Sequence, residues 1–362
     1  MTAVAEPSTP QPKHLVLVGA GHAHVQVLAR LAQQVSPDLQ LTLITHHPRH
    51  LCDGMLSGFA AGHYALDDCA IALEPLVQKS GARWLTARAT GLDASARTVS
   101  LEDGNEVSYD WLSVNTGAVQ DRAQIELTLP GAREHALFVR PLDSFGALWP
   151  RVMALAQARP LRVAVMGNGA DGIELAMAIR HRLNNSAVTL ITGGAAVAAG
   201  YPPAVQQRVM AALKARHITV LTDVAAGIQA EEIQLGCGAR LACDVPVIAG
   251  ETQAPSWLVH SDLALDEHGF IAVDACQRST SHANVFAEGG ASTGSPLSTA
   301  LAAAVSGFEP APRQPAGHTL TLLSYGNRHA LASWGNFCAE GHWVWLWKTW
   351  MDRRFVKRHH KN

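Results

Sequence analysis

The sequence predicts an α/β fold in which one βαβ unit occurs twice. Each copy consists of an apolar strand, a glycine-rich turn, a helix with apolar residues at helical spacing, and a second apolar strand that ends in threonine. The first copy covers residues 13–45 and the second covers residues 161–192. A repeated βαβ order favours parallel sheets with helices packed on their faces.

The elements of the two copies correspond one to one. In the order of the chain, we expect a strand at 14–18, a helix at 24–35, a strand at 41–45, a strand at 162–166, a helix at 173–183 and a strand at 188–192. Each copy would form the centre of one domain, and 362 residues with 48% hydrophobic side chains can supply a core for both.

The turn of the second copy has the spacing of a dinucleotide-binding loop. Residues 167–172, GNGADG, form a GxGxxG motif between the strand and the helix. The first glycine permits a tight turn, the second lets the backbone approach a pyrophosphate, and the third lets the helix pack closely on the strand. The residues expected to bind a dinucleotide are Gly167, Asn168, Gly169 and Gly172. The alternative is a βαβ unit without a ligand.

The turn of the first copy keeps two of the three glycines. Gly19, Ala20 and Gly21 begin the motif, and His24 occupies the position of the third glycine. A histidine is tolerated there if the helix tilts outward or if the imidazole turns to solvent. We expect Gly19, Ala20 and Gly21 to approach a phosphate, again with a ligand-free turn as the alternative.

Neither unit has the acidic residue that commonly binds ribose hydroxyls at the end of the second strand. Thr45 and Thr192 stand near those positions. A threonine donates one hydrogen bond but lacks the two acceptor oxygens of a carboxylate, so ribose recognition is expected to be weaker or to come from elsewhere. No arginine follows Thr192 closely, and the choice between NADH and NADPH stays open.

The composition excludes several classes of protein. A net charge of -2 gives no global basic field for nucleic acid. Six cysteines without CxxC or regular zinc spacing argue against a disulfide scaffold or a dithiol centre and indicate a cytoplasmic protein. No secretory leader or spanning helix is expected. His46, His47 and His50 lack matching carboxylate or thiol groups, so we expect a solvated loop and no metal site.

Several stretches carry a resemblance to a known group of flavoproteins. The stretch YDWLSVNTGA at 109–118 is similar to a strand and turn of the pyridine nucleotide-disulfide oxidoreductase superfamily, in which Thr-Gly passes beside FAD. The stretches HPRHLCDGMLSGFAAGHY, FVRPLDSF, LTLLSYGNRHALAS and GHWVWLWKTWMDRRFVKR resemble the NADH-dehydrogenase-like domain often fused ahead of selenide, water dikinase. The resemblance covers about residues 15–358.

This resemblance implies a domain order and a reaction. The FAD domain would comprise residues 13–145 and 276–308, with an NAD(P)H domain inserted at 146–275 and a linker and C-terminal extension at 309–362. The cofactors would be FAD and NAD(P)H, with hydride transfer to the flavin and electron transfer to a small acceptor such as a quinone. Further FAD contacts would come from Thr116, Gly117, Gly289 and Gly290.

The resemblance also implies a catalytic position for Glu174, where nicotinamide and flavin stack in relatives. The alternative for Glu174 is an exposed acid in the first helical turn that interacts with the helix dipole. Gly290 stands where the family has an aspartate, Glu251 stands where backbone normally passes close to the cofactor, and the chain after Gly294 is short. These departures leave open a second hypothesis, a catalytically impaired nucleotide-binding protein that associates with a membrane.

A third hypothesis, a sulfide-oxidising quinone reductase, requires a pair of reactive thiols. Cys237 and Cys243 flank GARLA in an expected hairpin. We expect them to form a cross-strand pair of small core residues instead of a dithiol, which counts against sulfide oxidation.

The C-terminal segment combines aromatic and basic residues. Five of the nine tryptophans lie at 334–350, and residues 348–361 have six Lys or Arg and one Asp, a local charge of 6 - 1 = +5. On a helix, one stripe would contain Val344, Trp347, Met351 and Phe355, with Lys348, Asp352 and much of the basic cluster elsewhere. We expect residues 343–361 to attach the protein peripherally to an anionic inner membrane from the cytoplasmic side. The alternative is packing against the chain's own FAD domain or against a twin subunit in a homodimer.

Overall fold

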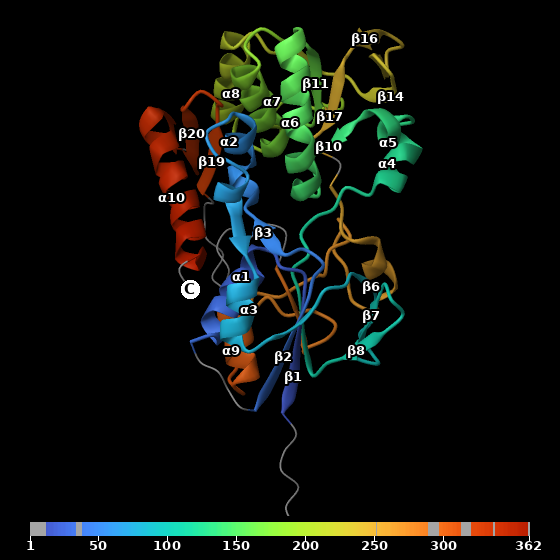
Figure 1. Ribbon diagram of the computed structural model, residues 1–362, viewed down its shortest axis with the longest axis vertical. Helices are drawn as coiled ribbons and strands as arrows, with labels where there is room; N and C mark the ends of the chain where they lie inside the picture. The colour runs from blue at the N-terminus through green and yellow to red at the C-terminus, as the bar shows by residue number, and fades with distance from the viewer. Residues whose placement is uncertain are drawn as a thin grey trace, which may run out of the picture.

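Two parallel sheets form the frame of the molecule and lie toward opposite ends of its long axis (Figure 1). The computed structural model describes residues 12–33, 38–250, 252–288, 297–312, 320–335 and 337–360.

The first sheet contains the first βαβ unit. Its strand order is β18 (Val285–Ala287), β9 (Trp111–Val114), β1 (Lys13–Val18), β2 (Leu39–Ile44) and β5 (Arg83–Leu85). All neighbouring strands are parallel. Helix α1 (His22–Leu31) packs beside α3 (Glu74–Ser80) and α9 (Leu297–Val305). A three-stranded antiparallel sheet of β6 (Ala89–Asp93), β7 (Thr98–Leu101) and β8 (Glu106–Ser108) lies at the same end of the molecule (Figure 1).

The second sheet contains the second βαβ unit. Its strand order is β10 (Leu137–Phe138), β17 (Val245–Ile248), β11 (Arg162–Met166), β12 (Ala187–Ile191) and β13 (Thr219–Leu221), again all parallel. The helices of this half are α4 (Arg122–Thr128), α5 (Ala132–His135), α6 (Leu142–Ala158), α7 (Ala170–Arg182) and α8 (Pro203–Ala215). The buried side chains of α6, α7 and α8 form one hydrophobic core with this sheet.

An antiparallel sheet of β14 (Ala225–Gln229), β15 (Glu232–Leu235) and β16 (Arg240–Ala242) completes the second half. The expected hairpin is therefore present, but the expected cysteine pair is wrong. Cys237 is exposed in the turn, whereas Cys243 is buried and its amide donates to the carbonyl of Glu231. Cys237 lies in the turn between β15 and β16 and not on a strand, so the two thiols do not face each other across the strands.

Several short elements lie between the larger helices and strands of the chain. They are β3 (Arg49–Leu51), the 3₁₀ turn η1 (Asp53–Met55), α2 (Leu56–Ala60), the 3₁₀ turn η2 (Asp67–Cys69), β4 (Ala70–Ala72) and the 3₁₀ turn η3 (Ser256–His260). Helix α2 belongs to the chain of the first half, yet it packs on α7 of the second.

The C-terminal segment forms a separate layer along the side of the molecule (Figure 1). Strands β19 (Leu320–Ser324), β20 (Ala330–Trp334) and β21 (Phe337–Gly341) make an antiparallel sheet, and helix α10 (His342–His360) packs on it and on β4. Strand β19 contacts α7, so this layer bridges both halves. No helix among the described residues is long and apolar enough to cross a membrane.

The α/β fold with two Rossmann-like units and a C-terminal helical extension is confirmed. The expected strand at 162–166 is identical to β11. The expected helix at 173–183 begins three residues late, because α7 already starts within the glycine turn at Ala170. Helix α1 likewise starts at His22 instead of residue 24. A strand, a glycine turn and a helix in sequence are local features, which is why the pattern predicted them.

Gly326, in the turn between β19 and β20, fixes the C-terminal layer against α7. Its φ is +77°, and a Cβ at this position would lie 2.5 Å from the carbonyl oxygen of Met177. We expect Gly326→Ala to lower the free energy of unfolding by about 2–5 kcal/mol, from the left-handed backbone together with the clash.

Gly104→Ala is the matched control for this substitution. Gly104 has φ +83°, but a Cβ there would meet no atom within 4 Å. In urea unfolding, we expect Gly104→Ala to lower the free energy of unfolding by about 1–2 kcal/mol, the cost of a left-handed backbone conformation for alanine. Equal losses for the two variants would contradict close packing of the turn on α7.

Candidate functional site

The second glycine loop, residues 167–172, has the geometry that a dinucleotide requires. Gly167 has φ +147°, a conformation that favours glycine, and Gly172 lets the first turn of α7 lie against Gly167 without a side chain between them. A Cβ on Gly169 would meet no atom within 4 Å, so open space lies above the backbone at the helix start. The carbonyl of Asn168 accepts from the amide of Ala198, which anchors the loop. Backbone amides at an open helix N-terminus are the groups that bind phosphates in such loops.

The first glycine loop is tied to the core by His24. The imidazole has no solvent exposure, its Nδ1 lies 2.6 Å from the carbonyl oxygen of Gly19, and its Nε2 lies 2.8 Å from the Ser113 hydroxyl oxygen. Burial lowers the pKa of His24 to about 4, so the ring is neutral, with Nδ1 donating to Gly19 and Nε2 accepting from Ser113. The expected orientation of this imidazole toward solvent is therefore wrong, because the side chain turns inward and makes two hydrogen bonds.

The first loop also contacts the side chain of Asn115, which directly follows β9. Its Oδ1 lies 3.2 Å from the amide nitrogen of Ala23 and 3.4 Å from that of His24, and its Nδ2 donates to Glu288 at 2.9 Å. The Asn115 carboxamide also takes the space that a Cβ on Gly21 would need. These amides at the helix start are the groups that bind a pyrophosphate in such loops. A phosphate that binds the amides of Ala23 and His24 would have to displace the Asn115 carboxamide.

Sequence reasoning assigned no role to Asn115. A signal for it was present, because asparagine side chains commonly cap backbone amides, and this one directly precedes the Thr-Gly turn. The partner amides lie 91 and 92 residues away along the chain. Only the pairing of β9 beside β1 brings them together.

The structure describes some of the other residues predicted to contact a cofactor. Thr116 is exposed, and Gly117 has φ +72° with open space around it, so both are accessible beside the loop. Thr45 and Thr192 use their hydroxyls within their own turns: Thr45 accepts from the amide of His47, and Thr192 donates to the carbonyl of Ala195. The residues that lie outside the described part of the chain are Gly289, Gly290 and Glu251.

Glu174 lies in the second turn of α7, where the two halves and the C-terminal layer meet. It is half-buried, and its carboxylate accepts from the amide of Ser324 on β19. Loss of water around the carboxyl raises its pKa to about 7, although nearby Lys348 acts in the opposite direction. The alternative of an exposed first-turn acid is wrong, because the first-turn acid of α7 is Asp171.

A network of charges connects the same three parts of the molecule. Arg140 lies 3.1 Å from Asp53 of η1 and 3.4 Å from Asp171 of α7. Lys348 of α10 donates to the carbonyl of Gly54 and lies 2.9 Å from Asp352. Burial alone would lower the pKa of Lys348, but the charges of Glu174 and Asp352 raise it above its ordinary value. This buried, charged Lys348 is a correction to the exposed basic cluster expected from the sequence.

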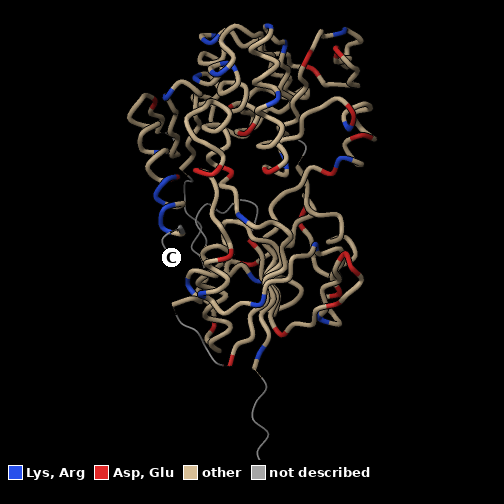
Figure 2. The backbone as a smooth tube through the Cα atoms, in the orientation of Figure 1, with Lys and Arg blue, Asp and Glu red and all other residues tan. Residues whose placement is uncertain are grey.

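Helix α10 has one face on the protein and another in solvent. Val344 is fully buried against β20, and the ring of Phe355 stacks on His22 at a centroid distance of 3.8 Å. The expected membrane-facing stripe is thus wrong for these two residues. The exposed apolar residues of this helix are Trp343, Leu346, Trp347 and Trp350, between 37% and 56% accessible. Lys and Arg gather over its last turns (Figure 2), where the exposed cations are Arg353, Arg354, Lys357 and Arg358.

The histidines after β2 do not form a loop free in solvent. The rings of His46 and His47 lie 3.7 Å apart, and His50 is largely buried with an unpartnered Nε2. Within the ranges that the structure describes, no three His, Cys, Asp or Glu side chains are grouped to hold a metal ion.

The family model that matches this architecture is described as pyridine nucleotide-disulphide oxidoreductase, and it matches residues 13–306. The chain belongs to the pyridine nucleotide-disulphide oxidoreductase family. The match includes both glycine loops, Glu174 and the strands of both parallel sheets, and it ends before the C-terminal layer.

Several named proteins are similar to this member of the pyridine nucleotide-disulphide oxidoreductase family. The sulfide-quinone reductase of Aquifex aeolicus is 30% identical over 29% of this chain and 24% of its own length. The NADH dehydrogenase-like protein YutJ of Bacillus subtilis is 25% identical over 52% of this chain and 51% of its own. A type II NADH:quinone oxidoreductase of Staphylococcus epidermidis is 29% identical over 34% and 30%. The chain therefore matches about half or less of the length of these relatives.

The fold similarity extends over nearly the whole chain. The solved structure of the sulfide:quinone oxidoreductase from Aquifex aeolicus has a TM-score of 0.79 at 17% identity, and the similarity covers 96% of this chain and 92% of that one. The family binds FAD and NAD(P)H. The second loop of this chain has open space at Gly169, whereas in the first loop the Asn115 side chain already occupies the backbone amides of Ala23 and His24.

We expect Asn115→Ala to bind FAD about 5- to 150-fold more tightly than the unaltered protein, because two backbone hydrogen bonds of about 0.5–1.5 kcal/mol each no longer have to be broken. The same change should lower the stability of the FAD-free protein by about 1 kcal/mol, since the start of α1 loses its cap. Quenching of flavin fluorescence measures the first effect and urea unfolding the second.

Asn115→Asp is the matched control, because it keeps an acceptor at the helix start but adds a negative charge where the pyrophosphate must bind. It should bind FAD more weakly than the unaltered protein. An Asn115→Ala variant with unchanged FAD affinity would show that this side chain does not compete with the cofactor.

Glu174 should make stability depend on pH in a defined direction. Its folded pKa is about 7, above the ordinary 4.5, so the folded state binds more protons than the unfolded state between these values and stability falls as pH rises through them. Glu174→Gln removes this effect and can still accept from Ser324. On going from pH 5 to pH 8, we expect the free energy of unfolding of the variant to rise by about 1–3 kcal/mol relative to that of the unaltered protein.

The measurement is urea unfolding of both proteins at the two pH values. Glu106→Gln, at an exposed position of β8, is the control. It should change the free energy of unfolding by the same amount at pH 5 and at pH 8. If Glu174→Gln also changes the free energy of unfolding by the same amount at both pH values, the Glu174 carboxyl does not titrate between pH 5 and pH 8 in the folded protein.

Proposed function

We propose that this protein is an FAD-dependent NAD(P)H dehydrogenase that passes electrons to a quinone. The observation that carries the proposal is the pair of glycine loops, each at the head of its own parallel sheet, with Glu174 between the two halves. The names of the relatives, sulfide-quinone reductase and NADH:quinone oxidoreductase, support a quinone as the acceptor.

The roles of the residues follow from their positions. Residues 167–172 would bind the pyrophosphate of NAD(P)H at the start of α7, and Gly19, Ala20, Gly21, Thr116 and Gly117 would hold FAD. Bound FAD supplies the group that accepts a hydride and releases electrons to the acceptor. Glu174 would position the nicotinamide, and its pKa of about 7 lets its carboxyl hold or release a proton near neutral pH.

The division into domains is part of the same proposal. Residues 13–145 and 276–308 would form the FAD domain around the first sheet, residues 146–275 the NAD(P)H domain, and residues 309–362 the linker and C-terminal extension. The pairing of β10 with β17 favours a first crossover before Leu137 instead of at residue 146. The return of β18 to the first sheet supports the insertion of one domain into the other.

The C-terminal helix supports attachment to the cytoplasmic face of an inner membrane. Trp343, Leu346 and Trp350 are exposed on α10, and the exposed arginines and lysine follow in its last turns. Indole rings suit the depth of lipid head groups, and cations bind anionic lipid. Such attachment would bring the electron donor to a membrane-dissolved quinone.

A second candidate, a nucleotide-binding protein without turnover, is favoured by one observation. Asn115 and His24 satisfy the first loop from both sides with hydrogen bonds of the protein itself. In this case the second loop would bind NAD(P)H while the first stays closed to FAD.

The deciding experiment is anaerobic titration of the purified protein, loaded with FAD, with NADH and NADPH. We expect the flavin absorbance to bleach and then to recover when a water-soluble quinone is added. Gly169→Val fills the space above the second loop, so it should raise the NAD(P)H concentration needed for bleaching at least about tenfold, with FAD content unchanged.

The opposite result identifies the second candidate. A colourless protein that takes up no added FAD, but whose binding of NADH or NADPH is weakened by Gly169→Val, would overturn the dehydrogenase proposal. If the flavin absorbance bleaches but does not recover when the quinone is added, the protein is a dehydrogenase whose electron acceptor is not a quinone.

A further inference from the structure

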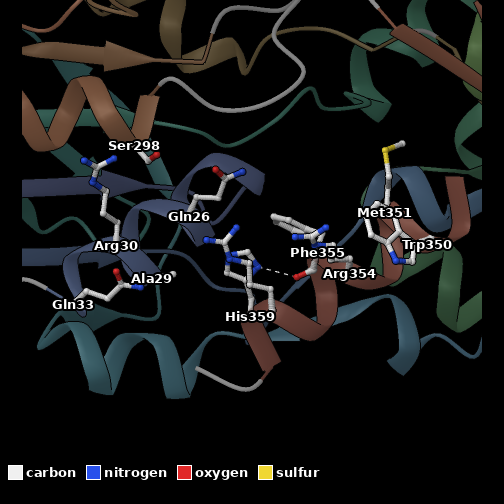
Figure 3. A pocket seen from close by; sticks show the side chains of 11 residues that line it. Gln26, Ala29, Arg30, Gln33, Ser298, Trp350, Met351, Arg354, Phe355 and His359 are labelled. Atoms are coloured by element: carbon white, nitrogen blue, oxygen red, sulfur yellow. Dashed lines mark hydrogen bonds between the residues drawn. The ribbon is translucent and has the colours of Figure 1, made fainter. Parts of the chain in front are cut away.

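A pocket of about 560 Å³ lies between α1 and α10, and no glycine of the two loops lines it. Side chains from α1 and the residues just after it face side chains of α10 across this space (Figure 3). Its polar and aromatic lining includes Gln26, Arg30 and Gln33 on one side and Arg354, Phe355 and Arg358 on the other.

The pocket is strongly positive. Arg30, Arg354 and Arg358 line it, and none of the described residues that line it is acidic. Among the described residues, none of these three arginines has a carboxylate within 4.0 Å. Arg30 donates to the hydroxyl of Thr299, and the Arg354 guanidinium lies 4.9 Å from the centre of the Trp350 ring, so both have neutral neighbours. Three guanidinium groups without an acid favour an anion, and their planar forks suit phosphate oxygens.

The pocket also has an apolar part that continues onto the surface. Trp350, Met351 and Phe355 line it beside the arginines. A neighbouring hollow of about 710 Å³ shares Trp350, Arg354 and Arg358 and reaches Leu346. A ligand here can place an anionic group among the arginines and an apolar group along the exposed aromatic face of α10.

We propose that this pocket binds a phosphate ester, with the phosphate held by Arg30, Arg354 and Arg358. The ester is either the head group of an anionic phospholipid or a soluble alkyl phosphate, which share this chemistry. In the first case the inference rests on the proposed membrane attachment. The ligand would bridge α1 and α10, and since Phe355 stacks on His22, it would also hold α10 against the first glycine loop.

The test compares two single-charge variants of the full-length protein. Arg30→Gln removes a pocket cation on α1, whereas Arg353→Gln removes a cation on α10 that lines only the outer hollow. The probes are vesicles of phosphatidylcholine with and without phosphatidylglycerol, measured by co-sedimentation, and glycerol phosphate, measured by calorimetry. Circular dichroism and urea unfolding check that both variants are folded.

We expect Arg30→Gln to weaken binding of phosphatidylglycerol vesicles or of glycerol phosphate about 10- to 100-fold, as for a lost charge-assisted hydrogen bond. Arg353→Gln should weaken vesicle binding no more than about fivefold, the contribution of one surface cation. Vesicle binding without glycerol phosphate binding assigns the lipid as the source.

The remaining outcomes separate this proposal from membrane attachment. Glycerol phosphate binding that depends on Arg30, without vesicle binding, supports the pocket and contradicts membrane attachment. Vesicle binding that both substitutions weaken equally supports attachment and overturns the pocket. Binding of neither probe overturns both.

Discussion

The arrangement of the molecule depends on Lys348, a buried cation that must find its partners on other segments. Its ammonium group donates to the carbonyl of Gly54 in the first half of the chain and lies beside Asp352 on its own helix. Glu174, on α7 of the second half, is close enough to raise its pKa. A buried charge without partners is very costly, so α10, η1 and α7 have to be in place together.

The two glycine loops show how one local motif acquires two different states. In the second loop, the space above Gly169 is open and the helix start is accessible. In the first loop, Asn115 caps the corresponding amides and His24 fills the position beneath the turn. Both loops have glycine conformations suited to phosphate, so the difference in accessibility comes from two side chains, His24 of α1 and Asn115 at the end of β9. If FAD displaces Asn115, the protein can act as a dehydrogenase; if Asn115 stays in place, the protein binds a nucleotide only at its second loop.

Helix α10 reconciles two expectations that the sequence presented as alternatives. Its aromatic and basic composition exceeds what one helix face needs for packing. Val344, Lys348 and Phe355 contact the protein, while Trp343, Leu346 and Trp350 remain exposed. The helix therefore packs on its own domain and still presents an aromatic and cationic surface. The pocket beside α1 lies next to the contact of Phe355 with His22, and residues of both helices line it.

The sequence by itself determined the elements whose signals are local. Strand β11, the two glycine turns and the helices that follow them could be predicted because apolar periodicity and glycine spacing act within about 30 residues. The tertiary structure decided which side chains close or open those turns. The inward orientation of His24 depends on Ser113, and the cap from Asn115 depends on the pairing of β9 with β1. The burial of Lys348 depends on Gly54, 294 residues away. Periodicity assigns residues to helix faces, but it contains no information on which face a distant segment will cover.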